Sequence, residues 1–265
     1  MDNVEALFWT RMRAFTRARI GLGRAGDAQP TQALLDFQLG YARARDAVYR
    51  ELNVSQLEDA LSPRPILRVH SQATNRSAYL RRPDLGRLLT EDSAAHLRDY
   101  AEGDWDLVFV LADGLSAGAA EKWGPAVIEA CRVRLPSLRM APIVIATHAR
   151  VALGDQVGEY LGARCVMVLL GERPGLSVPD SLGIYITWAP QTGTSDNLRN
   201  CISNIHRDGL APEVAATRAA WLVREAIRLR LTGVALKEDA EEIRLNSTSS
   251  TRASAPAADL PSHLA

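Results

Sequence analysis

Continuous apolar runs of strand length recur along the central part of the chain and alternate with helical patterns. Such runs lie at 105–112, 143–146 and 165–170, and a further candidate lies at 182–188. Strands that are apolar on both faces are typical of a parallel sheet covered by helices on both sides. The sequence therefore predicts an α/β fold with a Rossmann-like, doubly wound parallel sheet.

Apolar residues at helical spacing precede and follow these runs. Steps of three and four after Pro30 predict a helix that ends before Pro63. A short helix is predicted over 152–161, and a closing helix over 212–231 begins at Pro212. The predicted apolar stripes are Leu34, Phe37, Tyr41, Ala44 and Val48 in the first helix, and Ala215, Ala219, Leu222, Ala226 and Leu229 in the last.

Changes in composition divide the chain into three predicted parts. Residues 1–95 lack long apolar strand runs, and we predict that they form an N-terminal helical arm. Residues 96–245 hold the Rossmann-like domain. Residues 246–265 are rich in Ser, Thr, Ala and Pro, so they offer too little apolar surface to fold and are predicted to be a disordered tail.

Charge and cysteine content exclude several classes of function. The chain has 31 Lys plus Arg and 31 Asp plus Glu, so no net field attracts nucleic acid or an anionic membrane. Three widely spaced cysteines lack the close pairs of a zinc site, which favours reduced thiols. Since the N-terminus resembles no secretion signal and no apolar run has transmembrane length, we expect a cytoplasmic protein.

Common catalytic motifs are missing from the sequence. Gly21, Gly23 and Gly26 match G-x-G-x-x-G, but no buried strand precedes them, so an irregular loop is predicted rather than a dinucleotide site. Phosphate-loop, G-x-S-x-G and H-E-x-x-H patterns do not occur. We assign no catalytic residue and no metal ligand.

Polar residues follow the predicted strands at the edge where open parallel sheets bind ligands. Asp113 and Ser116 follow the first strand and suit either a helix cap or a ligand contact. Glu172 directly follows 165–170, where it would offer an acceptor at the mouth of a cleft, and a simple ion pair with Arg173 is the alternative.

Three other side chains near this edge gain no ligand role from the residues alone. His148 and His206 lie in loops and are expected to be solvated or hydrogen-bonded. Cys201 is expected to be a small buried apolar residue, as most free cysteines are.

Seven separated blocks of sequence carry a resemblance to a known family. They are RIGLGRAG from Arg19, PTQALLDFQLGYARARDAV from Pro30, ATNRSAYLRRPDLGRLL from Ala73, DLVFVLADGLSA from Asp106, RVALGDQVGEYLGAR from Arg150, LLGERPGLSVPDSLGIYITWAP from Leu169 and RNCISNIHRDGL from Arg199. In order and spacing, over roughly residues 15–237, the chain resembles the small subunit of ethanolamine ammonia-lyase.

The resemblance implies an adenosylcobalamin-dependent lyase that converts ethanolamine to acetaldehyde and ammonia. It implies a hetero-oligomer of several large–small pairs, with the cofactor held between this chain and a large subunit that carries the substrate site. The family's cofactor contacts in the small subunit map here to Val151, Glu172 and Cys201. The resemblance also allows enclosure of the complex in a bacterial microcompartment within the cytoplasm.

Two further expectations complete the picture. No Asp-x-His-x-x-Gly segment, which would supply a histidine to cobalt, occurs in the sequence, so cobalamin is expected base-on, with its own dimethylbenzimidazole as ligand. The alternative functions are a purely structural partner of the large subunit and a free-standing Rossmann-type nucleotide-binding protein. The failed glycine motif and the missing catalytic set count against the second.

Overall fold

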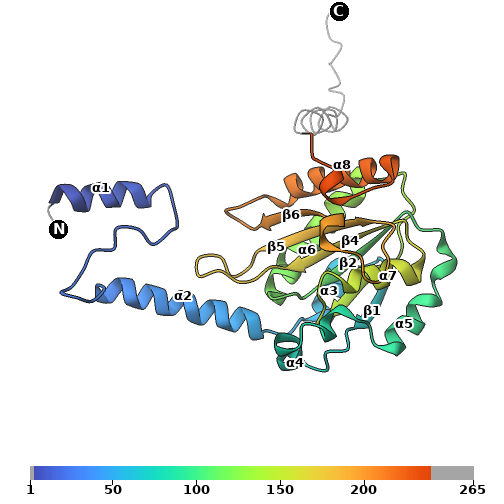
Figure 1. Cartoon of the computed structure of the whole chain (residues 1–265), viewed down its shortest axis with the longest axis horizontal. Helices are drawn as coiled ribbons and strands as arrows, with labels where there is room; N and C mark the ends of the chain where they lie inside the picture. The colour runs from blue at the N-terminus through green and yellow to red at the C-terminus, as the bar shows by residue number, and fades with distance from the viewer. Residues whose placement is uncertain (1–2, 240–265) are drawn as a thin grey trace, which may run out of the picture.

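A six-stranded β-sheet with helices on both faces forms the body of the protein, and a helical arm extends to one side (Figure 1). The computed structural model describes residues 3–239, so the predicted tail at 246–265 lies outside the described residues. Helices α6 (Ala117–Arg134) and α8 (Pro212–Leu229) cover one face, and α5 (Glu91–Arg98) and α7 (Leu153–Leu161) cover the other. The predicted α/β class is confirmed.

The sheet is mixed rather than wholly parallel. In spatial order its strands are β1 (Ile66–His70), β3 (Ile143–Thr147), β2 (Leu107–Ala112), β4 (Cys165–Gly171), β5 (Leu182–Trp188) and β6 (Asn200–Ile205). The first four are parallel, whereas β5 is antiparallel to β4 and β6 is antiparallel to β5. The predicted all-parallel sheet is therefore wrong at β5 and β6, and the doubly wound, Rossmann-like arrangement stays a prediction for the parallel part.

The antiparallel direction of β5 follows from the length of its connection to β4. Only residues 172–181 join β4 to β5, and they contain no helix. A parallel crossover needs roughly a dozen residues or more and usually a helix, whereas an antiparallel return needs only a short loop. The strand at 182–188 was correctly predicted as a strand, and its direction could have been deduced from this spacing.

The sequence pattern missed the two edge strands, β1 and β6. In β1 only Leu67 and Val69 are buried, and in β6 only Ile202 and Ile205 are. An edge strand with one exposed face carries polar residues there and so lacks a continuous apolar run. Strand β1 lies within residues 1–95 and helix α5 crosses residue 95, yet both pack in the body. The division into domains stays a prediction.

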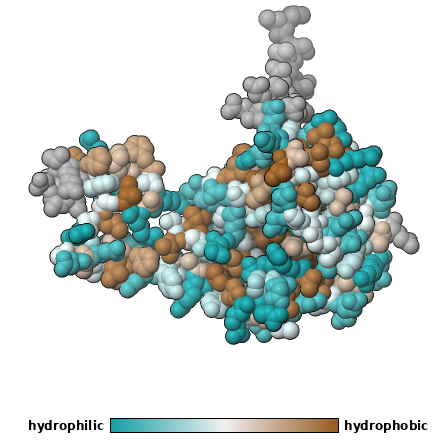
Figure 2. Space-filling view, viewed as in Figure 1, coloured by the Kyte–Doolittle hydropathy of each residue, from teal (hydrophilic) through white to brown (hydrophobic). Residues whose placement is uncertain are grey.

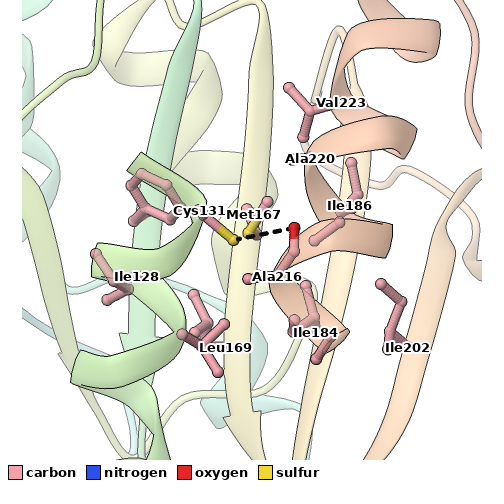
Figure 3. Close-up of a cluster of buried hydrophobic side chains, with 14 of the residues drawn as sticks. Ile128, Cys131, Met167, Leu169, Ile184, Ile186, Ile202, Ala216, Ala220 and Val223 are labelled. Carbon is pink, nitrogen blue, oxygen red and sulfur yellow. Dashed lines mark hydrogen bonds between the residues drawn. The ribbon is translucent and has the colours of Figure 1, made fainter. Parts of the chain in front are cut away.

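Alternate residues of the central strands fill two separate hydrophobic cores. Phe109 and Leu111 of β2 pack in the core beneath α6 and α8, while Val108 and Val110 pack against α7 and its neighbours. Figure 3 shows the first core, where Cys131 on α6 lies against the carbonyl of Ala216 on α8 at 3.9 Å. Burial on both faces explains the unbroken apolar run that predicted this strand.

Helix α8 begins at the predicted Pro212, ends at Leu229, two residues before its predicted end, and buries most of its predicted stripe. Ala215, Ala219, Leu222 and Ala226 are buried, but Leu229, in the last turn, is 41% exposed and was wrongly assigned to the core. The remaining body helices are α3 (Val54–Leu61) and α4 (Arg76–Arg81). Within residues 3–239, no helix combines the length and the apolarity needed to cross a membrane.

The arm consists of α1 (Asn3–Arg13), α2 (Thr31–Tyr49) and an irregular connection (Figure 1). Helix α2 begins where it was predicted but ends at Tyr49, and a separate helix, α3, occupies the remainder of the predicted span before Pro63. Leu34, Phe37 and Tyr41 of the α2 stripe are exposed. Figure 2 shows apolar residues gathered on this projecting lobe. The glycines of the G-x-G-x-x-G motif lie in this connection. A helix rather than a buried strand precedes them, so the predicted irregular loop is confirmed.

The arm touches the body through the loop between β4 and β5. Gly40 is the buried residue of α2, and a Cβ atom there would lie 2.8 Å from the carbonyl oxygen of Leu176. At the C-terminal end of α2, Arg50 forms an ion pair with Glu121 of α6. These contacts fix α2 beside loop 172–181.

Candidate functional site

An open cleft lies where β3 and β4 end. Its volume is about 740 Å³, within the range of roughly 300–1,000 Å³ that is usual for ligand sites. A second cleft of about 380 Å³ adjoins it and shares Arg87 and Leu88. The first cleft is lined by Pro83, Asp84, Arg87, Leu88, Arg150, Val151, Leu170 and Tyr185, and the second also by Ala152 and residues 192–196.

Val151 lies in the first cleft, in the loop that follows β3. The backbone N–H of Arg150 donates to the carbonyl of Gly86 at 2.8 Å, which joins this loop to the segment before α5. The Arg150 guanidinium lies 4.4 Å from the centre of the Tyr79 ring. The side chain of Val151 is half-buried and presents apolar surface to the cleft.

A buried carboxylate holds the loop that carries Val151. Asp113 is fully buried at the end of β2 and accepts hydrogen bonds from the backbone N–H groups of His148 at 2.9 Å and Ala149 at 3.0 Å. Arg76 donates to the same carboxylate at 2.9 Å. Of the two roles considered for Asp113, the helix cap is not formed, because its oxygens bind the neighbouring loop and Arg76.

Ser116 likewise makes no helix cap. It stands at the N-cap position of α6, but its hydroxyl donates to the carbonyl of Pro179 at 2.9 Å. This bond ties the start of α6 to the loop between β4 and β5.

Both loop histidines are engaged in hydrogen bonds, as expected. His148 has a left-handed backbone (φ 55°), and its ring nitrogens lie 3.2 Å from the carbonyl of Ala73 and 3.0 Å from Glu51. The Nε2 atom of His206 lies 2.8 Å from the side-chain oxygen of Asn204. Neither histidine lines the two clefts.

Glu172 connects three strands and keeps one oxygen available. Its Oε2 accepts from the Ser181 hydroxyl at 2.5 Å, before β5, and from the Asn204 N–H at 3.2 Å, in β6. The alternative ion pair with Arg173 does not form. Oε1 makes no hydrogen bond to any residue in 3–239, so this half-buried carboxylate retains an acceptor.

Cys201 on β6 and Tyr185 on β5 lie opposite each other in the strand register, so their side chains share one face of the sheet. Burial raises the pKa of the Tyr185 hydroxyl, and the nearby Cys201 and Glu172 raise it further. Exclusion of water also raises the pKa of the Cys201 thiol. Cys201 is exposed rather than buried, because this face of the edge strand carries no covering helix.

Tyr185 connects the three predicted site residues. It lines the first cleft with Val151 and lies opposite Cys201 in the strand register, and its ring and the Glu172 carboxylate both border Gly183. Glu172 and Cys201 therefore lie beside the cleft rather than among its lining residues. Tyr185 was not among the predicted site residues because it stands within an apolar strand run. The phenolic hydroxyl within that run was the available signal.

These features place the chain in the class of α/β proteins with an open ligand cleft at the carboxyl edge of the parallel strands. Comparison with known proteins identifies it more closely. The chain belongs to the ethanolamine ammonia-lyase light chain family, whose model matches residues 6–237. This match begins at residue 6 rather than near residue 15, so it includes most of α1. The prediction of a lyase subunit of this family is confirmed.

The chain is similar to several proteins named ethanolamine ammonia-lyase small subunit. One from Azotobacter vinelandii is 47% identical over 249 residues, covering 91% of this chain and 92% of the relative. One from Rhodopseudomonas palustris is 50% identical over 232 residues, covering 86% and 89%. One from Xanthomonas campestris is 46% identical over 252 residues, covering 92% and 93%.

Proposed function

We propose that this chain is the cofactor-contacting small subunit of an adenosylcobalamin-dependent ethanolamine ammonia-lyase, which forms acetaldehyde and ammonia. The cofactor lies at the interface with the large catalytic subunit. One observation carries this proposal: Val151, Glu172 and Cys201, which are far apart in sequence, gather around Tyr185 beside the main cleft. Family membership supplies the activity class.

The groups around the cleft suit cobalamin, which presents a broad corrin edge with amides, a ribose and a phosphate. The free Oε1 of Glu172 can accept from an amide or a ribose hydroxyl. Val151 and Leu170 offer apolar surface, and Cys201 offers a polarisable thiol. When bound, adenosylcobalamin supplies the radical that starts the elimination of ammonia.

A partner subunit is expected to complete the site. The cleft is open on one side, and the large subunit is proposed to cover it and to bring the substrate site. The exposed apolar face of α2 is available for this contact. We propose several large–small pairs in the cytoplasm, with microcompartment enclosure as one location within it.

Co-expression with the large subunit tests this proposal. We expect the two chains to copurify, to bind adenosylcobalamin together and to release ammonia from ethanolamine, whereas the purified single chain releases none. Turnover by the single chain would contradict the proposal. Copurification with no contribution of this chain to cofactor affinity would instead support a purely structural partner.

Cobalamin is proposed to keep its own dimethylbenzimidazole on cobalt. His148 and His206 use their ring nitrogens in hydrogen bonds, and no histidine among residues 3–239 lines either cleft. The test is the paramagnetic resonance spectrum of cob(II)alamin in the complex, with histidine nitrogen isotopically labelled. We expect no change in the axial nitrogen splitting; a change would mean that a histidine binds cobalt.

A further inference from the structure

Two arginines line the main cleft without a carboxylate partner in the described part of the chain. Arg87 is exposed, and its side chain makes no hydrogen bond or ion pair with residues 3–239. Arg150 stacks on Tyr79, donates to the Tyr79 carbonyl at 3.4 Å and has a buried Nε atom with no partner. Both guanidinium groups thus keep donors for a ligand.

The carboxylate that lines the first cleft is already neutralised, because Asp84 pairs with Arg82 at 2.6 Å. The charge that remains on the lining of this cleft is therefore positive. In the second cleft Asp196 lies 3.1 Å from Arg199, whose guanidinium also binds the buried Asp155 at 2.7 Å, so no positive charge remains there besides that of Arg87. A concave surface focuses such a field, and a guanidinium matches the oxygens of a phosphate well.

The position of Arg87 indicates where an anionic group would be held. Arg87 and Leu88 belong to both clefts, so they stand at the junction. Arg150 lines the first cleft next to Val151. A long ligand that occupies both clefts must pass Arg87, so an anionic group in the middle of such a ligand would lie close to this residue.

We propose that Arg87 and Arg150 form the subsite for the phosphodiester of the cobalamin nucleotide tail. The inference rests on the proposed cobalamin site and adds to it the binding of one charged group. Arg87 supplies an exposed, unpaired guanidinium, and Arg150 supplies a second one oriented by its stack on Tyr79.

The test compares two ligands in the copurified large–small complex. Adenosylcobinamide lacks the phosphate, ribose and base of adenosylcobalamin. We expect Arg87→Ala to lower the affinity for adenosylcobalamin about tenfold, as loss of one charge-assisted bond predicts. Arg87→Lys should lose less, and neither variant should change adenosylcobinamide binding. The matched control is Arg81→Ala, which removes an exposed arginine of α4 outside both clefts.

Two results would overturn the subsite while leaving the proposed function intact. One is unchanged adenosylcobalamin affinity in Arg87→Ala, and the other is an equal loss for both ligands. If the unmodified complex binds no adenosylcobalamin, the proposed function fails and the subsite fails with it.

Discussion

At the scale of single residues, Glu172 combines a structural role with a free acceptor. Its Oε2 is held by Ser181 and Asn204, which fixes the carboxylate and leaves Oε1 unbonded within the described residues. A rigidly placed acceptor costs little ordering entropy when a ligand binds. The sequence indicated this residue from its place after a buried strand, but its partners on two later strands require the fold.

Replacing Glu172 should weaken cofactor binding. We expect Glu172→Ala to lower cobalamin affinity in the complex by about 1–3 kcal/mol, because a buried donor of the ligand loses its acceptor. This corresponds to roughly tenfold to a hundredfold. Glu172→Gln, which keeps an acceptor oxygen, should recover part of the loss. Arg173→Ala is the neighbouring control, and a similar loss there would assign the effect to the loop as a whole.

Cys201 offers a chemical probe of the same surface. It is exposed, whereas burial raises the pKa of both Cys131 and Cys165 to about 12. Because the pKa of Cys201 is also raised, its thiolate is scarce at neutral pH, and its alkylation should accelerate only as the pH rises above about 8.5. We expect iodoacetamide to modify Cys201 alone, with cobalamin protecting it in the complex.

The extent of alkylation at each cysteine is measured by peptide mass mapping. Cys201→Ser is the control, because this variant has no thiol at that position. Equal alkylation with and without cobalamin would place the cofactor away from this strand.

At the scale of elements, the buried strands and the long helices were predictable and the edge strands were not. The run at 107–112 is buried on both faces, so its apolar pattern is unbroken. In β6, the exposed Ser203 and Asn204 break the pattern because one face is open. Since Cys201 lies on that open face, its exposure depends on a strand that the sequence did not predict.

Close packing of α7 on the sheet depends on a glycine. A Cβ atom at Gly154 would lie 2.3 Å from Val168 Cγ2, so Gly154→Ala should separate the helix from β4. We expect a loss of about 1–3 kcal/mol in the free energy of unfolding, measured by denaturant titration. At Gly175 the nearest atom would be 3.5 Å away, an ordinary contact. Gly175→Ala is the control and should be close to neutral; equal stability of both variants would mean that α7 adjusts freely.

At the scale of the whole molecule, the body and the arm differ in how much of their apolar surface is buried. The body buries its apolar residues in two cores, whereas α2 leaves Leu34, Phe37 and Tyr41 exposed. Periodicity alone predicts a helix in both cases, because it reports an apolar stripe and says nothing of what covers it. The arm therefore forms its helices but leaves an apolar face of α2 uncovered by any residue that the structure describes.

The contact between Gly40 and Leu176 connects the arm to the loop that lies beside the cleft. Loop 172–181 touches α2 near its middle and carries Glu172 at its start. A partner that shifts α2 would therefore shift the carboxylate as well. Thermodynamic linkage makes such an effect reciprocal. A cofactor that favours one position of the loop would therefore raise the affinity of the arm for its partner by the same factor.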